Sequence, residues 1–278
     1  MLFDTHLHLI YLDRLNYPWL DDFEVLKHDN LFTTYSRDAA RLGISGCLHM
    51  EVDVADDLIE LETTLIAEMM AQPGSLMRGA ISSCRPENGD FAEFLERNLD
   101  DPTVKGFRRV LHVMPDGLST TATFRDNIKR LSNTGRTFDL CVLPKQLGLA
   151  AELVDHCPDV NFVLDHCGVP DVAAGELEPW RTDISALAQR PNVHAKISGL
   201  VAYGDADSWG LDDIRTFFDA TVDAFGSGRI IWGSDSPVCN LGGGLATWVA
   251  ATHTLTQGWS EADRTAFYRA NALKLWQM

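Results

Sequence analysis

Short apolar segments alternate along the chain with longer segments whose apolar residues recur at helical spacing. The apolar segments span residues 3–9, 44–51, 77–82, 104–110, 138–142, 161–166, 193–198 and 229–235. Helices are predicted between and after them, over residues 34–42, 55–71, 91–98, 122–133, 147–156, a stretch ending at 189, 212–224, 245–254 and 261–275. Apolar runs of this length, separated by amphipathic stretches, are typical of parallel strands joined by helices.

Eight strand and helix units in 278 residues have the size and rhythm of an α/β protein of the (β/α)8 barrel type. An open doubly wound sheet is the alternative, but the G-x-G-x-x-G turn typical of its nucleotide-binding members does not follow the first strand. The chain has no internal repeat, low-complexity tract or linker-like stretch. We therefore expect one domain over residues 1–278, with loops over 11–38, 169–179 and 203–210.

The first predicted strand breaks the apolar pattern of the others. Asp4, His6 and His8 alternate with other residues, so a regular strand would direct all three to one face. An acid and two imidazoles on a buried face are costly unless they have partners or a function. The alternative is that one histidine is hydrogen-bonded in the core and the other belongs to a loop.

Polar residues also stand at the C-terminal ends of other predicted strands, where (β/α)8 barrels carry their chemistry. They are Glu51, Arg108, Arg109, His166, Lys196, Ser198 and Asp235. Imidazoles and carboxylates are the ligands of hydrolytic zinc sites, and without a metal the same groups can orient a carbonyl and deprotonate a water. We predict that His6, His8, His166 and Asp235 are catalytic, with Asp235 as the general base.

Each of these residues also has a structural explanation. Asp235 precedes Ser-Pro and could cap a helix or turn, Glu51 could be solvated, and His166 could be a core histidine bonded to the backbone. Arg108 and Arg109 suit a carboxylate or polyhydroxylated substrate, but they could instead form ion pairs with surface acids.

Composition narrows the class of partner. A net charge of −17 repels a phosphate backbone, so we expect no nucleic acid partner. The chain has no run of 18 or more apolar residues and no signal-like start, so we expect no membrane partner and a cytoplasmic protein. The six cysteines include no C-x-x-C pair and are predicted to be reduced core residues. The composition is compatible with a homo-oligomer and does not determine the oligomeric state.

Several motifs are spread over almost the whole chain. They are Asp4-Thr5-His6-Leu7-His8, Tyr17-Pro18-Trp19-Leu20, Phe107-Arg108-Arg109, Leu164-Asp165-His166-Cys167-Gly168, Lys196-Ile197-Ser198-Gly199-Leu200 and Gly233-Ser234-Asp235-Ser236-Pro237. In these motifs the chain resembles the amidohydrolase superfamily, and within it the sugar-lactonase branch, which includes fuconolactonase-like and pyrone-dicarboxylate lactonase-like enzymes. The resemblance implies a barrel enzyme that hydrolyses the ester of a small sugar-acid or carboxylated lactone.

The resemblance also implies roles for particular residues. Asp235 is expected to activate water, with His6, His8 and His166 around the lactone carbonyl. The residues expected to bind substrate are Arg108, Arg109, Lys196, His112 and Trp19.

The resemblance implies that a two-metal member would carry a bridging Lys or His ligand on the fourth or fifth strand. In this chain the fourth strand ends in arginines and the fifth in Cys141-Val142, so a two-metal site is not expected. The enzyme would therefore need no cofactor or hold at most one divalent ion, with zinc favoured. The candidate ligands are Glu51, His6, His8 and His166. Two alternatives stay open, a decarboxylase of small aromatic acids and a non-catalytic ligand-binding barrel.

Overall fold

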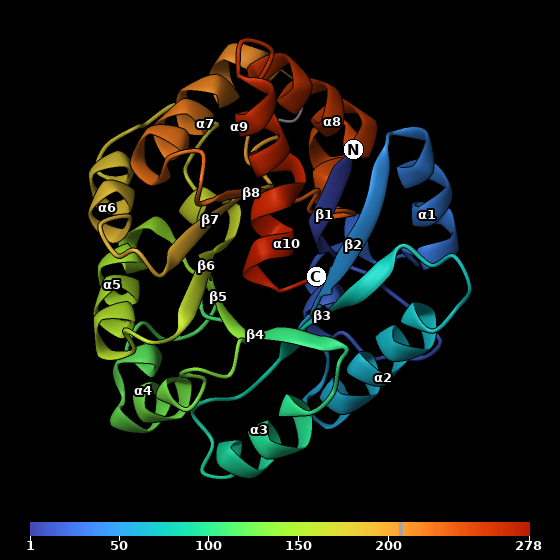
Figure 1. Ribbon diagram of the computed structural model, residues 1–278, viewed down its shortest axis with the longest axis vertical. Helices are drawn as coiled ribbons and strands as arrows, with labels where there is room; N and C mark the ends of the chain where they lie inside the picture. Colours follow the sequence, from blue (N-terminus) through green and yellow to red (C-terminus); the bar gives the residue numbers. More distant parts are fainter. Residues whose placement is uncertain (206–207) are drawn as a thin grey trace.

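The computed structural model describes residues 1–205 and 208–278, and residues 206–207 of the predicted loop 203–210 lie outside the described residues. Eight parallel strands pair in chain order and form the inner ring in Figure 1. The strands are β1 (Leu2–Leu7), β2 (Ile44–Met50), β3 (Met77–Ser83), β4 (Val104–Val110), β5 (Thr137–Cys141), β6 (Asn161–Leu164), β7 (Val193–Ile197) and β8 (Ile230–Trp232).

Backbone hydrogen bonds connect the last strand to the first. The amide of Asp235 donates to the carbonyl of His6 at 2.8 Å, and the amide of His8 donates to the carbonyl of Ser236 at 2.8 Å. The sheet therefore curls into a (β/α)8 barrel, as predicted. An open doubly wound sheet is excluded, because its first and last strands would be separate edges.

Helices cover the outside of the strand ring (Figure 1). The α-helices are α1 (Phe32–Arg41), α2 (Ile59–Met70), α3 (Phe91–Leu99), α4 (Ala122–Lys129), α5 (Leu147–His156), α6 (Trp180–Leu187), α7 (Leu211–Phe225), α8 (Gly244–Leu255), α9 (Glu261–Thr265) and α10 (Asn271–Leu275). The predicted helix 261–275 contains a π turn, Ala266–Ala270, between α9 and α10. The predicted loop 11–38 contains two 3-10 turns, Pro18–Asp22 and Glu24–Leu26, and the start of α1.

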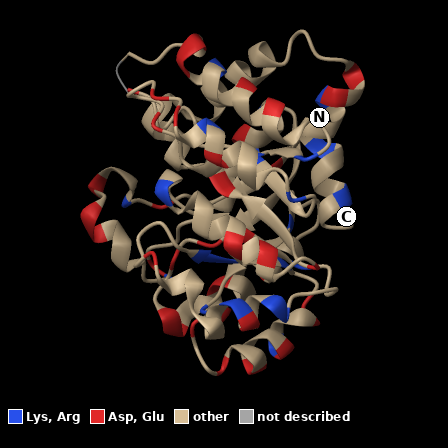
Figure 2. Ribbon diagram, turned by 90° about the vertical axis from the view of Figure 1, so that its left-hand side faces the viewer, with Lys and Arg blue, Asp and Glu red and all other residues tan. Residues whose placement is uncertain are grey.

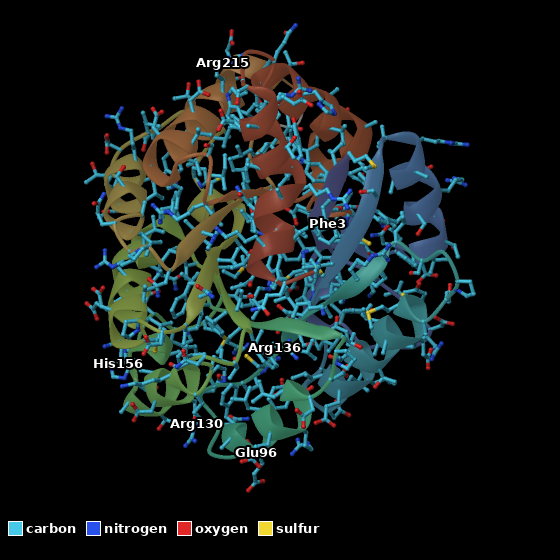
Figure 3. The ribbon with its side chains drawn as sticks, viewed as in Figure 1. Phe3, Glu96, Arg130, Arg136, His156 and Arg215 are labelled. Carbon is cyan, nitrogen blue, oxygen red and sulfur yellow. The ribbon has the colours of Figure 1, made fainter. Side chains whose placement is uncertain are left out.

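The N-terminal end of the barrel is closed by apolar side chains. In Figure 1, α10 lies across the ring of strands, and in Figure 3 Phe3 lies among the strands whereas Glu96 and Arg215 project from the outer helices. Trp276, just after α10, donates its indole N–H to Thr137 Oγ1 at 3.1 Å. The apolar cluster at this end comprises Phe3, Leu48, Met50, Ile81, Val163, Ile231, Ala272, Leu275 and Trp276. This packing leaves the opposite end of the barrel for polar chemistry.

Acidic and basic residues are interspersed over the outer helices, and the acidic ones cover more of the view in Figure 2. All six cysteines are buried and free, as the sequence predicts. No helix in the described ranges is long and apolar enough to cross a membrane.

Candidate active site

Three histidines and one aspartate meet at the C-terminal end of the barrel. Asp235 Oδ1 lies 3.7 Å from His6 Nε2 and 3.5 Å from His8 Nε2, and Asp235 Oδ2 lies 3.6 Å from His166 Nδ1. The His6 and His166 rings are 4.4 Å apart between centroids. All four side chains are buried. The structure thus brings together the four residues that were predicted to be catalytic, and their roles stay predictions.

The path of β1 separates Asp4 from the two histidines. Its pairing with β2 changes register on both sides of Asp4. The Asp4 carboxylate accepts hydrogen bonds from the Tyr35 hydroxyl of α1 at 2.6 Å and from the Ser234 amide at 2.8 Å. The expectation that Asp4 shares a face with His6 and His8 is therefore wrong, because Asp4 attaches β1 to α1 and to the end of β8.

His6 in β1 and His8 just after it face each other. Nδ1 of His8 lies 3.0 Å from the carbonyl oxygen of Met50 and 3.1 Å from that of Glu51, so Nδ1 carries the proton and Nε2 a lone pair. That lone pair faces Nε2 of His6 at 3.1 Å, while Nδ1 of His6 lies 3.4 Å from Asp165. Burial lowers the pKa of His8 to about 3 and that of His6 well below its ordinary value, so both rings are neutral at pH 7.

Asp235 occupies a left-handed backbone conformation, with φ of 57°, which costs a residue with a side chain about 1–3 kcal/mol. Its side chain caps no helix, since the next 3-10 turn begins at Val238 with Pro237 at its N-cap and no side-chain capping bond. Burial raises the pKa of Asp235 to about 6, against the opposing effect of His166 and Arg108. A carboxylate with this pKa is suited to proton transfer near neutral pH.

His166 is also left-handed, with φ of 51°, and its Nδ1 lies 2.9 Å from the Ser198 hydroxyl. This side-chain contact differs from the backbone bond that a core histidine was expected to make. The neighbouring Gly199 has φ of +74°, and a Cβ there would lie 3.0 Å from each of Asp235 Oδ2, His166 Nδ1 and Tyr203 Cε2. A residue without a side chain therefore keeps the space between Asp235 and His166 open.

Below the histidines, cations and acids form a buried ion-pair layer. Lys196 Nζ donates to Asp139 at 2.7 Å and to Asp165 at 2.9 Å, and the side chain of Lys196 is fully buried. Arg108 donates to Glu51 at 2.6 Å and to Asp165 at 3.2 Å. Because carboxylates of the protein pair with both cations, a substrate would have to share Lys196 or Arg108 with these acids, and their role in substrate binding stays a prediction.

Glu51 belongs to this layer and not to the group of histidines. One carboxylate oxygen accepts from Arg108, and the other accepts from the backbone amide of Asp53 at 2.7 Å. Burial would raise the pKa of Glu51, but Arg108 outweighs it and lowers the pKa. Glu51 is thus not solvated, and its role as a metal ligand stays a prediction.

Of three further predicted residues, Arg109 lies near the end of β4, and His112 and Trp19 lie in the segments after β4 and β1. Arg109 donates from Nε to Glu87 at 2.9 Å and is buried. His112 and Trp19 are partly exposed; Nδ1 of His112 lies 2.9 Å from Cys141 Sγ, and the Trp19 indole N–H donates to a backbone carbonyl at 2.8 Å. Arg109 is thus held in an ion pair, whereas His112 and Trp19 stay predicted substrate contacts.

Asp139 and Asp165 both belong to the ion-pair layer, and no role for either was predicted from the sequence. Their sequence context could have indicated a buried ion pair, because each is an acid within an apolar strand segment, as Asp4 is. Burial would raise the pKa of Asp165, but Lys196 and His6 outweigh it and lower the pKa well below its ordinary value. Asp165 is therefore ionised, and its carboxylate contacts both the Lys196 ammonium group and the His6 ring.

Two groups of described residues have the donor atoms for one metal ion. They are His6, His8 and Asp235, and His6, Asp165 and His166, with ligand atoms within 4.8 Å of one another in each group. In the first group the Nε2 atoms of two neutral histidines converge beside a carboxylate. Imidazole nitrogens with a carboxylate oxygen are a donor set that zinc accepts.

Comparison with known proteins agrees with the resemblance seen in the motifs. The family described as amidohydrolase matches residues 3–278. An L-fucono-1,5-lactonase of Burkholderia ambifaria is 33% identical over 144 residues, which cover 51% of this chain and 49% of that protein. An L-fucono-1,5-lactonase of Burkholderia multivorans is 31% identical over 193 residues, or 63% of each chain.

A crystal structure of an amidohydrolase from Burkholderia multivorans with bound zinc has the same fold. It superposes with a TM-score of 0.89 over 100% of this chain and 99% of that one, at 23% identity. Since the family match extends from the first strand to the last residue, the chain belongs to the amidohydrolase family.

Proposed function

We propose that the protein hydrolyses the ester ring of a small lactone, with a sugar-acid lactone as the substrate class. One observation carries the proposal: a buried carboxylate, Asp235, with a pKa of about 6, lies within 3.7 Å of the imidazoles of His6, His8 and His166. This combination can deprotonate a water and bind a developing oxyanion. The similarity to two L-fucono-1,5-lactonases supports the choice of a lactone.

In the proposed reaction Asp235 takes a proton from a water molecule as the water oxygen bonds to the lactone carbonyl carbon. The bond from that carbon to the ring oxygen then breaks, and Asp235 returns the proton to the departing oxygen. One lactone and one water become one open-chain hydroxy acid, which releases a proton to solvent at neutral pH. We assign to His6 and His166 the stabilisation of the oxyanion, where each well-placed donor contributes about 3 kcal/mol.

A divalent ion fits the same residues. His6, His8 and Asp235 would hold it through two ring nitrogens and a carboxylate oxygen, with zinc as the favoured ion. When bound, such an ion supplies Lewis acidity that polarises a carbonyl. The Nδ1–H of His8 donates to backbone carbonyls, which fixes the ring with Nε2 as the ligand atom.

The test is acid release, followed with a pH indicator, from a panel of aldonolactones and carboxylated lactones. We expect acid release from at least one lactone, and we expect the Asp235→Asn variant to lose it. Parallel assays with chelator, together with metal analysis of the protein, show whether an ion is required. Release of carbon dioxide from aromatic acids without lactone hydrolysis would instead indicate a decarboxylase, and binding without turnover would indicate a ligand-binding barrel.

A further inference from the structure

The hydroxyl of Ser198 lies next to one of the active-site histidines. Ser198 follows the last residue of β7 and is fully buried. Its Oγ lies 2.9 Å from Nδ1 of His166, and in the described part of the chain that nitrogen is the hydroxyl's one hydrogen-bond partner. A buried hydroxyl whose proton has no acceptor is costly. We therefore expect the hydroxyl proton of Ser198 to point at Nδ1 of His166.

Asp235 also lies near this ring nitrogen. Its Oδ2 is 3.6 Å from His166 Nδ1, which is beyond hydrogen-bond distance. The two neighbours favour opposite tautomers of the ring, because the hydroxyl proton of Ser198 needs a lone pair on Nδ1 and the Asp235 carboxylate attracts a proton there. A proton on Nδ1 would leave the Ser198 hydroxyl without an acceptor. The shorter distance and this cost favour the tautomer that Ser198 requires.

The tautomer decides what the other ring nitrogen of His166, Nε2, can do. Among the described residues Nε2 has no hydrogen-bond partner, and it is not one of the buried unpartnered atoms, so a ligand can reach it. The Nε2 atoms of His6 and His8 differ, because they lie 3.1 Å from each other. A neutral imidazole with a lone pair on Nδ1 carries its proton on Nε2. An Nε2–H group can donate to an oxyanion, whereas an unprotonated Nε2 would face the oxyanion with a lone pair.

We propose that Ser198 is a positioning residue that holds His166 in the tautomer with its proton on Nε2, where this proton stabilises the oxyanion. The proposal rests on the proposed lactone hydrolysis and deepens it, because it names the group that orients one of the oxyanion donors. It also has a consequence for metal binding. A ring nitrogen that carries a proton has no free lone pair, so Nε2 of His166 would not bind a metal ion.

The tautomer can be measured without substrate. Chelator-treated protein with nitrogen-15 in its histidine rings is studied by NMR at pH 8, above the ordinary histidine pKa of about 6.5. The signals of His166, one of nine histidines in the chain, are assigned by their loss in His166→Asn. We expect an unprotonated Nδ1 and a protonated Nε2 in the unmodified protein, and a shift toward protonated Nδ1 in Ser198→Ala. A protonated Nδ1 in the unmodified protein, or an unchanged tautomer in Ser198→Ala, would overturn the proposal.

Kinetics with a lactone that the unmodified enzyme hydrolyses test the consequence for turnover. Ser198→Ala should lower kcat about tenfold to a hundredfold with little change in KM, because the affected interaction is made only in the transition state. Ser198→Thr keeps a hydroxyl and should keep the tautomer and most of the turnover. Ser82→Ala is the matched control, because Ser82 is also buried and its hydroxyl lies 3.0 Å from that of Thr63 in α2. It should lose a similar amount of stability in urea unfolding and keep its kcat.

The outcomes separate this inference from the proposed function. Equal losses of kcat in Ser198→Ala and Ser82→Ala would overturn the positioning role, because both hydroxyls would then serve stability alone. A Ser198→Thr variant with the tautomer of the unmodified protein but the turnover of Ser198→Ala would contradict the link between tautomer and turnover. The expected tautomers without acid release from any lactone would support the action of Ser198 on the ring and contradict lactone hydrolysis.

Discussion

The two ends of the barrel use left-handed backbone conformations in different ways. Turns that lead into strands at the N-terminal end place glycine at positive φ, at Gly43, Gly74, Gly135 and Gly226, with Asn133 as an exception. The C-terminal end has glycines there as well, at Gly168 and Gly199, but it also places residues with side chains at positive φ, at Asp53, His166, Cys167, Val169 and Asp235. Glycine adopts this conformation without steric cost, whereas other residues lose about 1–3 kcal/mol each.

The difference shows where backbone strain is accepted so that a reactive side chain can be placed in the site. Glycine at position 166 or 235 would relieve the strain, but it would remove an imidazole or a carboxylate from the site. At the opposite end no such side chain is needed, and the apolar cluster with Trp276 closes the barrel. We infer that the N-terminal end contributes most of the free energy of unfolding, whereas the C-terminal end contains strained residues that serve the active site. Substitutions at the two ends can test this separation.

The largest effect is expected for Asp235→Asn. Loss of the general base should lower kcat at least about a thousandfold, which corresponds to about 4 kcal/mol of activation free energy. Stability should not fall, because burial raises the pKa of Asp235 to about 6 from 3.8. Above pH 6 the ionised carboxylate is therefore disfavoured in the folded state, and the amide relieves this cost by up to about 3 kcal/mol.

The measurement is kcat at pH 8 together with urea unfolding of chelator-treated protein at pH 8 and pH 4. The stability gain should be present at pH 8 and absent at pH 4, where the carboxyl is protonated in the folded protein. A variant that unfolds more readily at pH 8 would mean that Asp235 is a structural residue.

A smaller loss is expected in the ion-pair layer. Lys196→Met leaves Asp139 and Asp165 without their shared ammonium group, and breaking a buried pair of this kind costs about 3–5 kcal/mol. Urea unfolding at pH 7 measures the change. Adding Asp139→Asn to the variant removes one unpaired charge and should restore part of the loss. Full stability of Lys196→Met would show that the acids do not need the cation.

At the N-terminal end, Trp276→Ala should reduce the free energy of unfolding by about 3 kcal/mol, because it removes a large buried side chain from the apolar cluster. Trp276→Phe, the control, keeps one apolar ring and loses the hydrogen bond to Thr137 together with part of the buried volume, so a smaller loss of about 1–2 kcal/mol is expected. At a temperature where both variants are folded, kcat/KM should match the unmodified enzyme. A selective loss of kcat in the folded Ala variant would break the proposed division between the ends.

The sequence predicts the barrel and the group formed by Asp235 and its three histidines because both depend on local patterns, namely apolar strand segments and polar residues at their C-terminal ends. The position of Asp4 could not be predicted in the same way, because it depends on register shifts between β1 and β2. The ion-pair partners of Arg108 and Lys196 could not be predicted from the sequence either. Each is an acid on another strand, such as Glu51 or Asp139, 57 residues away along the chain, and a single sequence shows a charge without its partner.

The smallest effect tests the outer attachment of β1. Burial raises the pKa of Asp4, and hydrogen bonds from Ser234 and Tyr35 counteract that rise. Tyr35→Phe removes a donor that favours ionised Asp4, so we expect a loss of about 1–2 kcal/mol at pH 8. The loss should shrink as the pH falls through the raised pKa of Asp4, because the same bond then joins two neutral groups.

Tyr268→Phe is the matched control for this measurement. The Tyr268 hydroxyl is also buried, but its partner at 3.0 Å is the neutral Thr256 hydroxyl. The loss in that variant should therefore be the same at pH 8 and pH 4 when both are followed by urea unfolding. If Tyr35→Phe were equally independent of pH, the Asp4 carboxyl would keep one protonation state between pH 4 and pH 8, which would contradict the expected titration of Asp4 in this range. A pH-dependent loss confined to Tyr35→Phe would place an ionised carboxylate between β1 and α1, outside the barrel interior that holds His6 and His8.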